Sequence, residues 1–106
     1  MTKSNLINLL KIEKKTQEVE LSKELNLTKT IYKKLEKIQY LEHYIEYIEY
    51  FIFFLEWNTN DIKPYEKIVL KDIVFEFKEY LIIDNKEDFE GKEDEIIAFC
   101  NLFLSI

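Results

Sequence analysis

The chain has 106 residues, 47% of them hydrophobic and 34% charged, which suits one small soluble domain or a small head joined to a small body. A single Gly and a single Pro cannot supply the turns that a β-sandwich or β-barrel needs roughly every ten residues, so we expect long helices. The one cysteine, Cys100, excludes an intramolecular disulfide and suits a reducing compartment, so the expected location is cytoplasmic.

Charge is divided unevenly along the chain, whose net charge is −6. Residues 1–38 carry nine Lys and five Glu, a net charge of +4. Residues 39–106 carry six Lys and sixteen acidic residues, a net charge of −10. This division predicts a basic head over residues 1–38 and an acidic body over residues 39–106. A basic head is typical of a surface that binds polyanions.

The first two expected elements are short helices in the basic head. Residues 5–13 carry apolar side chains at helical spacing and follow Ser4, a suitable N-cap. Residues 14–18 are polar and are expected to form a connector, after which residues 19–26 return to helical spacing. Thr28 is the expected N-cap of a third helix.

The third expected helix extends from residue 28 to residue 57. Five residues spaced three or four apart lie on one face of this helix, which we call the acidic stripe: Glu42, Glu46, Glu49, Phe53 and Glu56. This spacing excludes a strand, which would need strict alternation. Its other faces are apolar, so we expect neighbours on most sides, a second copy of the protein among them. The expected partner interface consists of Tyr44, Tyr47, Phe51 and Phe54. The apolar stretch 45–57 is too short for a membrane span and carries three Glu, so we expect no membrane association.

A polar break at residues 58–61 precedes the last two expected helices. Pro64 suits the first turn of the next helix, which continues to about residue 83. Residues 74–83 can also be interpreted as a strand, because β-branched and aromatic residues are frequent there. Residues 84–95 form an acidic loop around Gly91, and a last helix is expected over residues 93–104. The expected fold is all-α: a short helix-turn-helix, a long aromatic-rich helix and two further helices in a small bundle.

The basic head has the arrangement of a helix-turn-helix, whose second helix enters the major groove of DNA. The expected DNA-binding side of that helix carries Thr28, Lys29, Thr30, Lys33, Lys34 and Lys37. Residues 4–38 resemble the helix-turn-helix domains of bacterial regulators such as the Mga-like and DeoR-like families, through Glu20, Leu21, Ser22, Leu25, Asn26, Leu27 and Thr28 in that order. The resemblance implies that the three leucines hold two helices together and that the lysines face DNA. Because the chain has no Arg, we expect contacts with phosphates rather than reading of bases.

Three other features of the sequence do not assemble a catalytic or metal site. The acidic loop departs from a calcium-binding loop, because Phe89 stands where that loop needs Gly. His43 is the only histidine, and one His with a carboxylate is too few ligands for a metal. Cys100 lacks a histidine to activate its thiol. We therefore expect no enzymatic activity, no metal and no cofactor.

The sequence leaves two functions in competition. The first is a small DNA-binding transcriptional regulator that dimerises through its acidic helical body. The second is an acidic helical inhibitor of a basic protein partner, of the immunity, antitoxin, anti-nuclease or anti-CRISPR kind, which its negative body would steer onto a cationic site. A helical adaptor without activity of its own is a third class.

Overall fold

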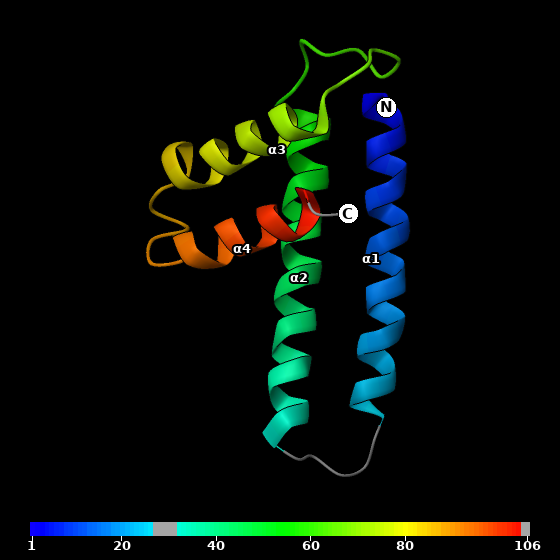
Figure 1. Ribbon diagram of the computed structural model, residues 1–106, viewed down its shortest axis with the longest axis vertical. Coiled ribbons are helices and arrows are strands. Elements are labelled where there is room, and N and C mark those ends of the chain that lie inside the picture. Colours follow the sequence, from blue (N-terminus) through cyan, green and yellow to red (C-terminus); the bar gives the residue numbers. More distant parts are fainter. Residues whose placement is uncertain (27–31, 105–106) are drawn as a thin grey trace. The chain divides into compact units, whose positions relative to one another are not determined.

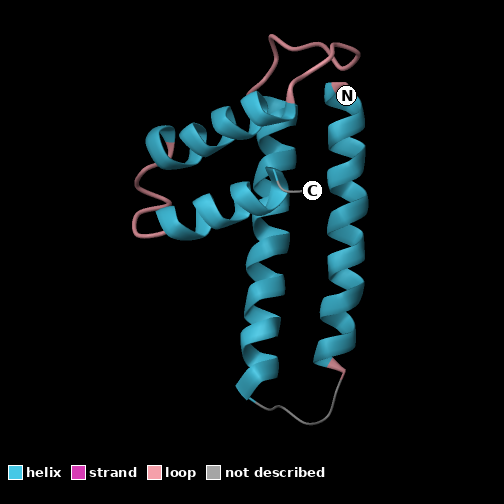
Figure 2. Cartoon of the chain, viewed as in Figure 1, coloured by secondary structure: helices cyan, strands magenta, loops and turns pink. Residues whose placement is uncertain are grey.

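The computed structural model describes residues 1–26 and 32–104, except for the side chains of residues 32–34. Within these ranges the chain is helical apart from its connecting segments (Figures 1 and 2). Its elements are α1 (Lys3–Leu25), α2 (Tyr32–Trp57), α3 (Leu70–Glu79), the π-helical turn η1 (Tyr80–Asp84) and α4 (Glu93–Leu104). The predicted all-α fold is confirmed, and residues 74–83 belong to helical elements rather than to a strand.

The chain divides into two compact units. Residues 4–60 form the first unit, which contains α2 and all of α1 except its first residue; we call it the helical hairpin. Residues 1–3 and 61–106 form the second, the C-terminal unit, which contains α3, η1 and α4. Residue 38, the end of the expected basic head, lies inside α2.

α1 is one continuous helix of 23 residues, so the prediction of two short helices joined by a connector was wrong. Residues 14–18 contain Lys, Gln and Glu, which are good helix formers, and no Gly or Pro. Two local bonds fit the helix: the Thr16 hydroxyl donates to the Ile12 carbonyl at 3.0 Å, and the Gln17 amide donates to Glu13 at 2.8 Å. The helix also begins at Lys3, one residue before the expected cap Ser4. The polar run is therefore a solvated stretch of helix and not a break.

α1 and α2 are antiparallel neighbours in the helical hairpin (Figure 1). Ion pairs join the N-terminal half of α1 to the C-terminal half of α2, from Lys11 to Glu56 at 3.8 Å and from Lys14 to Glu49 at 3.0 Å. Near the opposite ends of the helices, Lys37 lies 2.8 Å from Glu24. Such exposed pairs stabilise little individually, about 0–1 kcal/mol each. Their order along the helices shows the register in which α1 and α2 pair.

α2 agrees with the long helix predicted for residues 28–57 and ends at Trp57 as expected. Residues 28–31 of that prediction lie outside the described residues. Most apolar positions of α2 between Leu41 and Leu55 are buried, and its acidic stripe is exposed. After Trp57 the backbone N–H of Asn58 still donates to the Phe54 carbonyl at 2.8 Å, and the buried Thr59 hydroxyl donates to the Leu55 carbonyl at 2.6 Å. The predicted polar break thus closes the last turn of the helix.

The C-terminal unit is built on α3 and α4, which lie side by side (Figure 1). Phe77 of α3 meets Phe99 of α4 edge-to-face with ring centroids 6.3 Å apart, and Phe99 lies 5.7 Å from Phe103. Such aromatic pairs add about 0.5–1.5 kcal/mol beyond the burial of their area. The remaining buried apolar residues of this unit, among those described, are Ile73, Val74, Leu81, Phe89, Ile96 and Cys100.

α3 begins at Leu70, so the prediction of a helix starting near Pro64 was wrong. Val69 is extended (φ −95°, ψ 117°), and the segment before it pairs with the N-terminus of the chain instead of coiling. The N–H of Ile68 donates to the Met1 carbonyl at 2.8 Å, and the buried ammonium of Lys3 donates to the Ile62 carbonyl at 3.0 Å. These long-range bonds satisfy backbone groups that a helix would have used, and the local spacing cannot reveal them.

Candidate functional site

The two units differ in charge. The helical hairpin has eight Lys and nine acidic residues, a net charge of −1, while the C-terminal unit has seven Lys and twelve acidic residues, a net charge of −5. Residues 84–95, which we call the acidic turn, hold seven acidic residues and two Lys, a net charge of −5. The rest of the C-terminal unit is therefore neutral, and its whole net charge is concentrated in twelve residues.

The backbone of the acidic turn is held by local bonds and one buried anchor. At the end of η1, the backbone N–H and the side-chain amide of Asn85 both donate to the Tyr80 carbonyl, at 3.1 and 2.8 Å. The N–H groups of Asp88 and Phe89 donate to the Asn85 carbonyl, and the Phe89 ring is buried. Gly91 adopts φ +80°, a left-handed conformation that glycine adopts without strain. The chain therefore reverses direction in a defined way between η1 and α4.

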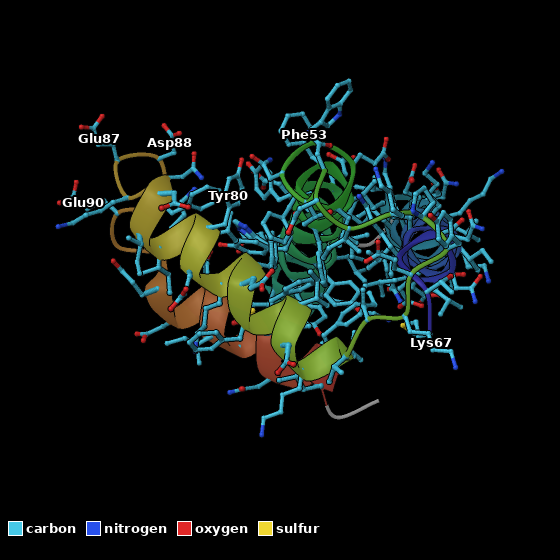
Figure 3. All side chains as sticks on the ribbon, turned by 90° about the horizontal axis from the view of Figure 1, so that it is seen from above. Phe53, Lys67, Tyr80, Glu87, Asp88 and Glu90 are labelled. Carbon is cyan, nitrogen blue, oxygen red and sulfur yellow. The ribbon has the colours of Figure 1, made fainter. Side chains whose placement is uncertain are left out.

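The carboxylates of the acidic turn are exposed. Glu87, Asp88 and Glu90 extend outward from the turn (Figure 3). Among the described residues these three side chains have no ion-pair or hydrogen-bond partner. The ammonium of Lys92, one of the two cations of the turn, lies 6.0 Å from the centroid of the Phe89 ring. The outer surface of the turn therefore carries a concentrated negative charge that no described side chain neutralises, and it is accessible to a partner.

Part of this charge stabilises α4. Glu93, Asp94 and Glu95 occupy the first turn of the helix, where negative side chains interact favourably with the helix dipole. Glu87, Asp88 and Glu90 precede the helix and have no such role. Across the described residues, no group of three or more His, Cys, Asp or Glu side chains is placed to hold a metal ion. Recognition of a cationic surface is what this arrangement can offer chemically.

The predicted DNA-binding residues are only partly described. Thr28, Lys29 and Thr30 lie outside the described residues, as do the side chains of Lys33 and Lys34. Lys37 is exposed on α2, and its ammonium lies 2.8 Å from Glu24 and 3.3 Å from Glu20 of α1. Hydrogen bonds to Glu24 and then to Glu20 raise the pKa of Lys37. Lys37 is thus engaged inside the hairpin, and DNA binding by this segment stays a prediction.

The four residues predicted to form a partner interface are buried in the chain itself. Tyr44, Tyr47, Phe51 and Phe54 retain between 0% and 8% of their exposure and belong to the core. Their role toward a partner also stays a prediction. Among the described side chains of α2, the exposed aromatic residues are instead Tyr40, Phe53 and Trp57.

Comparison of the chain with protein-family models, with curated proteins and with solved structures found no match. Over the described residues, no helix combines the length and the apolar character needed to cross a membrane. Cys100 is buried, and burial raises the pKa of its thiol to about 11. A thiol of this kind stays protonated near neutral pH and is a poor nucleophile.

A groove on the helical hairpin was not predicted from the sequence. It has a volume of about 540 Å³ and is lined chiefly by Lys11 and Lys15 of α1 and by Glu49, Phe53, Glu56 and Trp57 of α2. The sequence contained one indication of it: Phe53 lies within the otherwise acidic stripe of α2, and Trp57 follows one helical turn later. Which residues of α1 complete the groove depends on the register of the hairpin, which the spacing within one helix does not contain.

Proposed function

We propose that this protein is a helical binding protein whose acidic turn docks on the cationic surface of a protein partner. The observation that carries the proposal is the concentration of the C-terminal unit's net charge of −5 in one exposed turn. A compact patch of one sign accelerates encounter with a surface of the opposite sign and disfavours partners of like charge. Inhibition of a toxin or a nuclease through its cationic active site is the activity that this chemistry favours.

The acidic turn supports this function better than the basic head supports DNA binding. Lys37 already pairs with two glutamates of α1, and Lys11 and Lys14 pair with glutamates of α2. Three lysines of the head therefore balance charge within the hairpin. Glu87, Asp88 and Glu90 have no comparable partner among the described residues.

Site-specific photo-cross-linking tests the proposal in the host. A photoreactive residue in place of Lys86, an exposed position in the turn, is expected to cross-link a basic protein. The same residue in place of Lys23, an exposed position on α1, is expected not to do so. The triple variant Glu87→Gln, Asp88→Asn, Glu90→Gln then removes three negative charges from the turn and is expected to abolish the cross-link.

A matched triple variant separates the turn from net charge. Glu66→Gln, Asp72→Asn and Glu76→Gln remove three exposed negative charges from the same unit outside the turn. We expect this variant to keep the cross-link. Equal loss in both triple variants, or a captured partner without a cationic surface, would contradict the proposal.

A mobility-shift assay with duplex DNA decides the competing prediction. At low salt, where phosphate contacts are strongest, the acidic-turn proposal expects no shift. A shift by the wild-type protein that disappears in Lys33→Glu with Lys34→Glu would support the DNA-binding regulator instead.

A further inference from the structure

Two aromatic side chains project from the hairpin into solvent. Phe53 and Trp57 are 54% and 65% exposed, lie one helical turn apart, and have ring centroids 6.3 Å apart. Figure 3 shows Phe53 pointing away from its helix. Aromatic residues are enriched in the cores of protein interfaces and are frequent hot spots there. Both rings line the hairpin groove and supply much of its apolar surface.

The charges around the pair are largely sorted by helix. The α1 side of the hairpin groove carries Lys11, Lys14 and Lys15 with one acidic residue, Glu18, and the α2 side carries Glu49 and Glu56. The ion pairs Lys11–Glu56 and Lys14–Glu49 place the two rows at the same levels along the hairpin. With Glu18 included, the groove has three positive and three negative residues, so its net charge is zero. A strongly basic or strongly acidic partner would gain no electrostatic advantage from this surface.

We propose that a second copy of the chain occupies this groove in a two-fold symmetric dimer. Consider a two-fold axis that is parallel to the helices of the hairpin and lies in the plane of contact. It places α1 of one copy over α2 of the other and keeps each residue at the same height along the helix axis. The lysine row of each copy then faces the glutamate row of its partner. A two-fold interface must be self-complementary, and this sorted pattern meets that requirement.

The same axis gives a familiar helix arrangement. Because α1 and α2 of one copy are antiparallel, each of the four helices of the two hairpins lies beside antiparallel neighbours, as in an up-and-down four-helix assembly. Phe53 and Trp57 of each copy become covered by α1 of the other. Burial of these two rings supplies the apolar contacts, while the charge rows set register and orientation.

The sharpest test exchanges charge between copies. The first variant carries Lys11→Glu and Lys15→Glu, and the second carries Glu49→Lys and Glu56→Lys. Each is expected to be monomeric alone by sedimentation equilibrium, because each sets like charges against like. An equimolar mixture is expected to form a heterodimer, because glutamates of one variant then face lysines of the other. All four positions are exposed, so both chains should fold, which circular dichroism verifies.

Aromatic variants test the floor of the groove. Phe53→Ala is expected to raise the dimer dissociation constant at least about tenfold. Phe75→Ala is the matched control, because Phe75 is also a phenylalanine and is 52% exposed in the C-terminal unit. Trp57 is the only tryptophan, so its emission in the wild-type protein should shift to shorter wavelength as the concentration rises.

Three outcomes would overturn the dimer. They are a wild-type chain that stays monomeric with unchanged tryptophan emission, charge variants that each still dimerise alone, and a mixture that forms no heterodimer. None of them bears on the acidic turn, which lies in the other unit and is tested by cross-linking at Lys86.

Discussion

Tyr44 places a titratable group in the core of the chain. Its side chain is 8% exposed, and its hydroxyl donates to the Glu13 carboxylate at 3.5 Å across the hairpin. Burial is the main cause that raises the pKa of Tyr44 to about 12, and the negative charge of Glu13 adds to it. The phenol is therefore held in its protonated form well above the pH at which an unfolded tyrosine ionises.

We expect Tyr44→Phe to remove part of the alkaline destabilisation of the protein. Below pH 10 the phenol is protonated in both folded and unfolded chains, so it contributes no pH dependence. Between pH 10 and about pH 12 the unfolded chain loses this proton while the folded chain keeps it, so stability falls as pH rises. The variant lacks this loss, and its urea midpoint should fall less steeply than that of the wild type over this window.

The control for this prediction is Tyr65→Phe, the same change at a tyrosine that is 77% exposed. Cys100, whose pKa burial raises to about 11, contributes an alkaline loss of the same sign in all three proteins and cancels in the comparison. If Tyr44→Phe and wild type lose stability in parallel up to pH 12, the phenol is not protected by the fold.

At the scale of elements, α1 shows how composition can mislead. Residues 14–18 are polar and were predicted to be a connector. A polar run is equally compatible with the solvent-exposed face of a continuous helix, which is what the structure shows. Residues 3–25 contain no Gly or Pro, so they have no chain-breaking signal. The resemblance to a helix-turn-helix domain counted residues 5–13 as a separate preceding helix, whereas these residues belong to the same helix as Glu20 to Leu25.

We expect Thr16→Pro to test the continuity of α1 directly. Proline in a helix interior removes a hydrogen bond and clashes with the preceding turn, which costs about 3 kcal/mol or more. In a connector the same substitution would be tolerated. The expected result is a fall in the free energy of unfolding of at least that size, measured by urea denaturation with circular dichroism.

Glu93→Pro is the matched control, because it introduces proline at the first residue of α4. The N–H of that position is not needed for the helix, so little destabilisation is expected there. A Thr16→Pro protein as stable as Glu93→Pro would show that residues 14–18 are not helical in solution.

The sequence could predict features that are local and not those that depend on pairing. The spacing of the acidic stripe found the long helix that ends at Trp57, and Gly91 among carboxylates located the acidic turn. The start of α3 was missed because residues 62–68 bond to the N-terminus, more than sixty positions away in the case of Ile68 and Met1. The hairpin groove was missed for the same reason, since Lys11 meets Glu56 only once the register of two helices is known.

At the scale of the whole molecule, the two units carry different kinds of surface. The helical hairpin is close to neutral and sorts its charges into rows that pair within it. The C-terminal unit concentrates its charge on one turn. In the proposals made above, the first surface binds its own copy and the second binds a basic partner, so each can change without loss of the other.

Dimerisation through the hairpin groove predicts that stability depends on protein concentration. A partner that binds the folded chain but not the unfolded chain stabilises the fold by mass action. The wild-type melting temperature should therefore rise as total protein concentration increases across the dissociation constant of the dimer. The variant with Lys11→Glu and Lys15→Glu should melt at the same temperature at all concentrations, because its glutamates repel those of a second copy.

Mixing provides the control for folding defects in this experiment. If the charge variants were only destabilised, an equimolar mixture would melt as the average of its components at every concentration. If they are dimerisation variants, the mixture regains the concentration dependence of the wild type, because opposite rows again face one another across the interface. A wild-type melting temperature that is constant over a hundredfold range spanning the working concentrations would exclude stabilisation by a second copy. The exposed aromatic pair of α2 would then face solvent in the native protein.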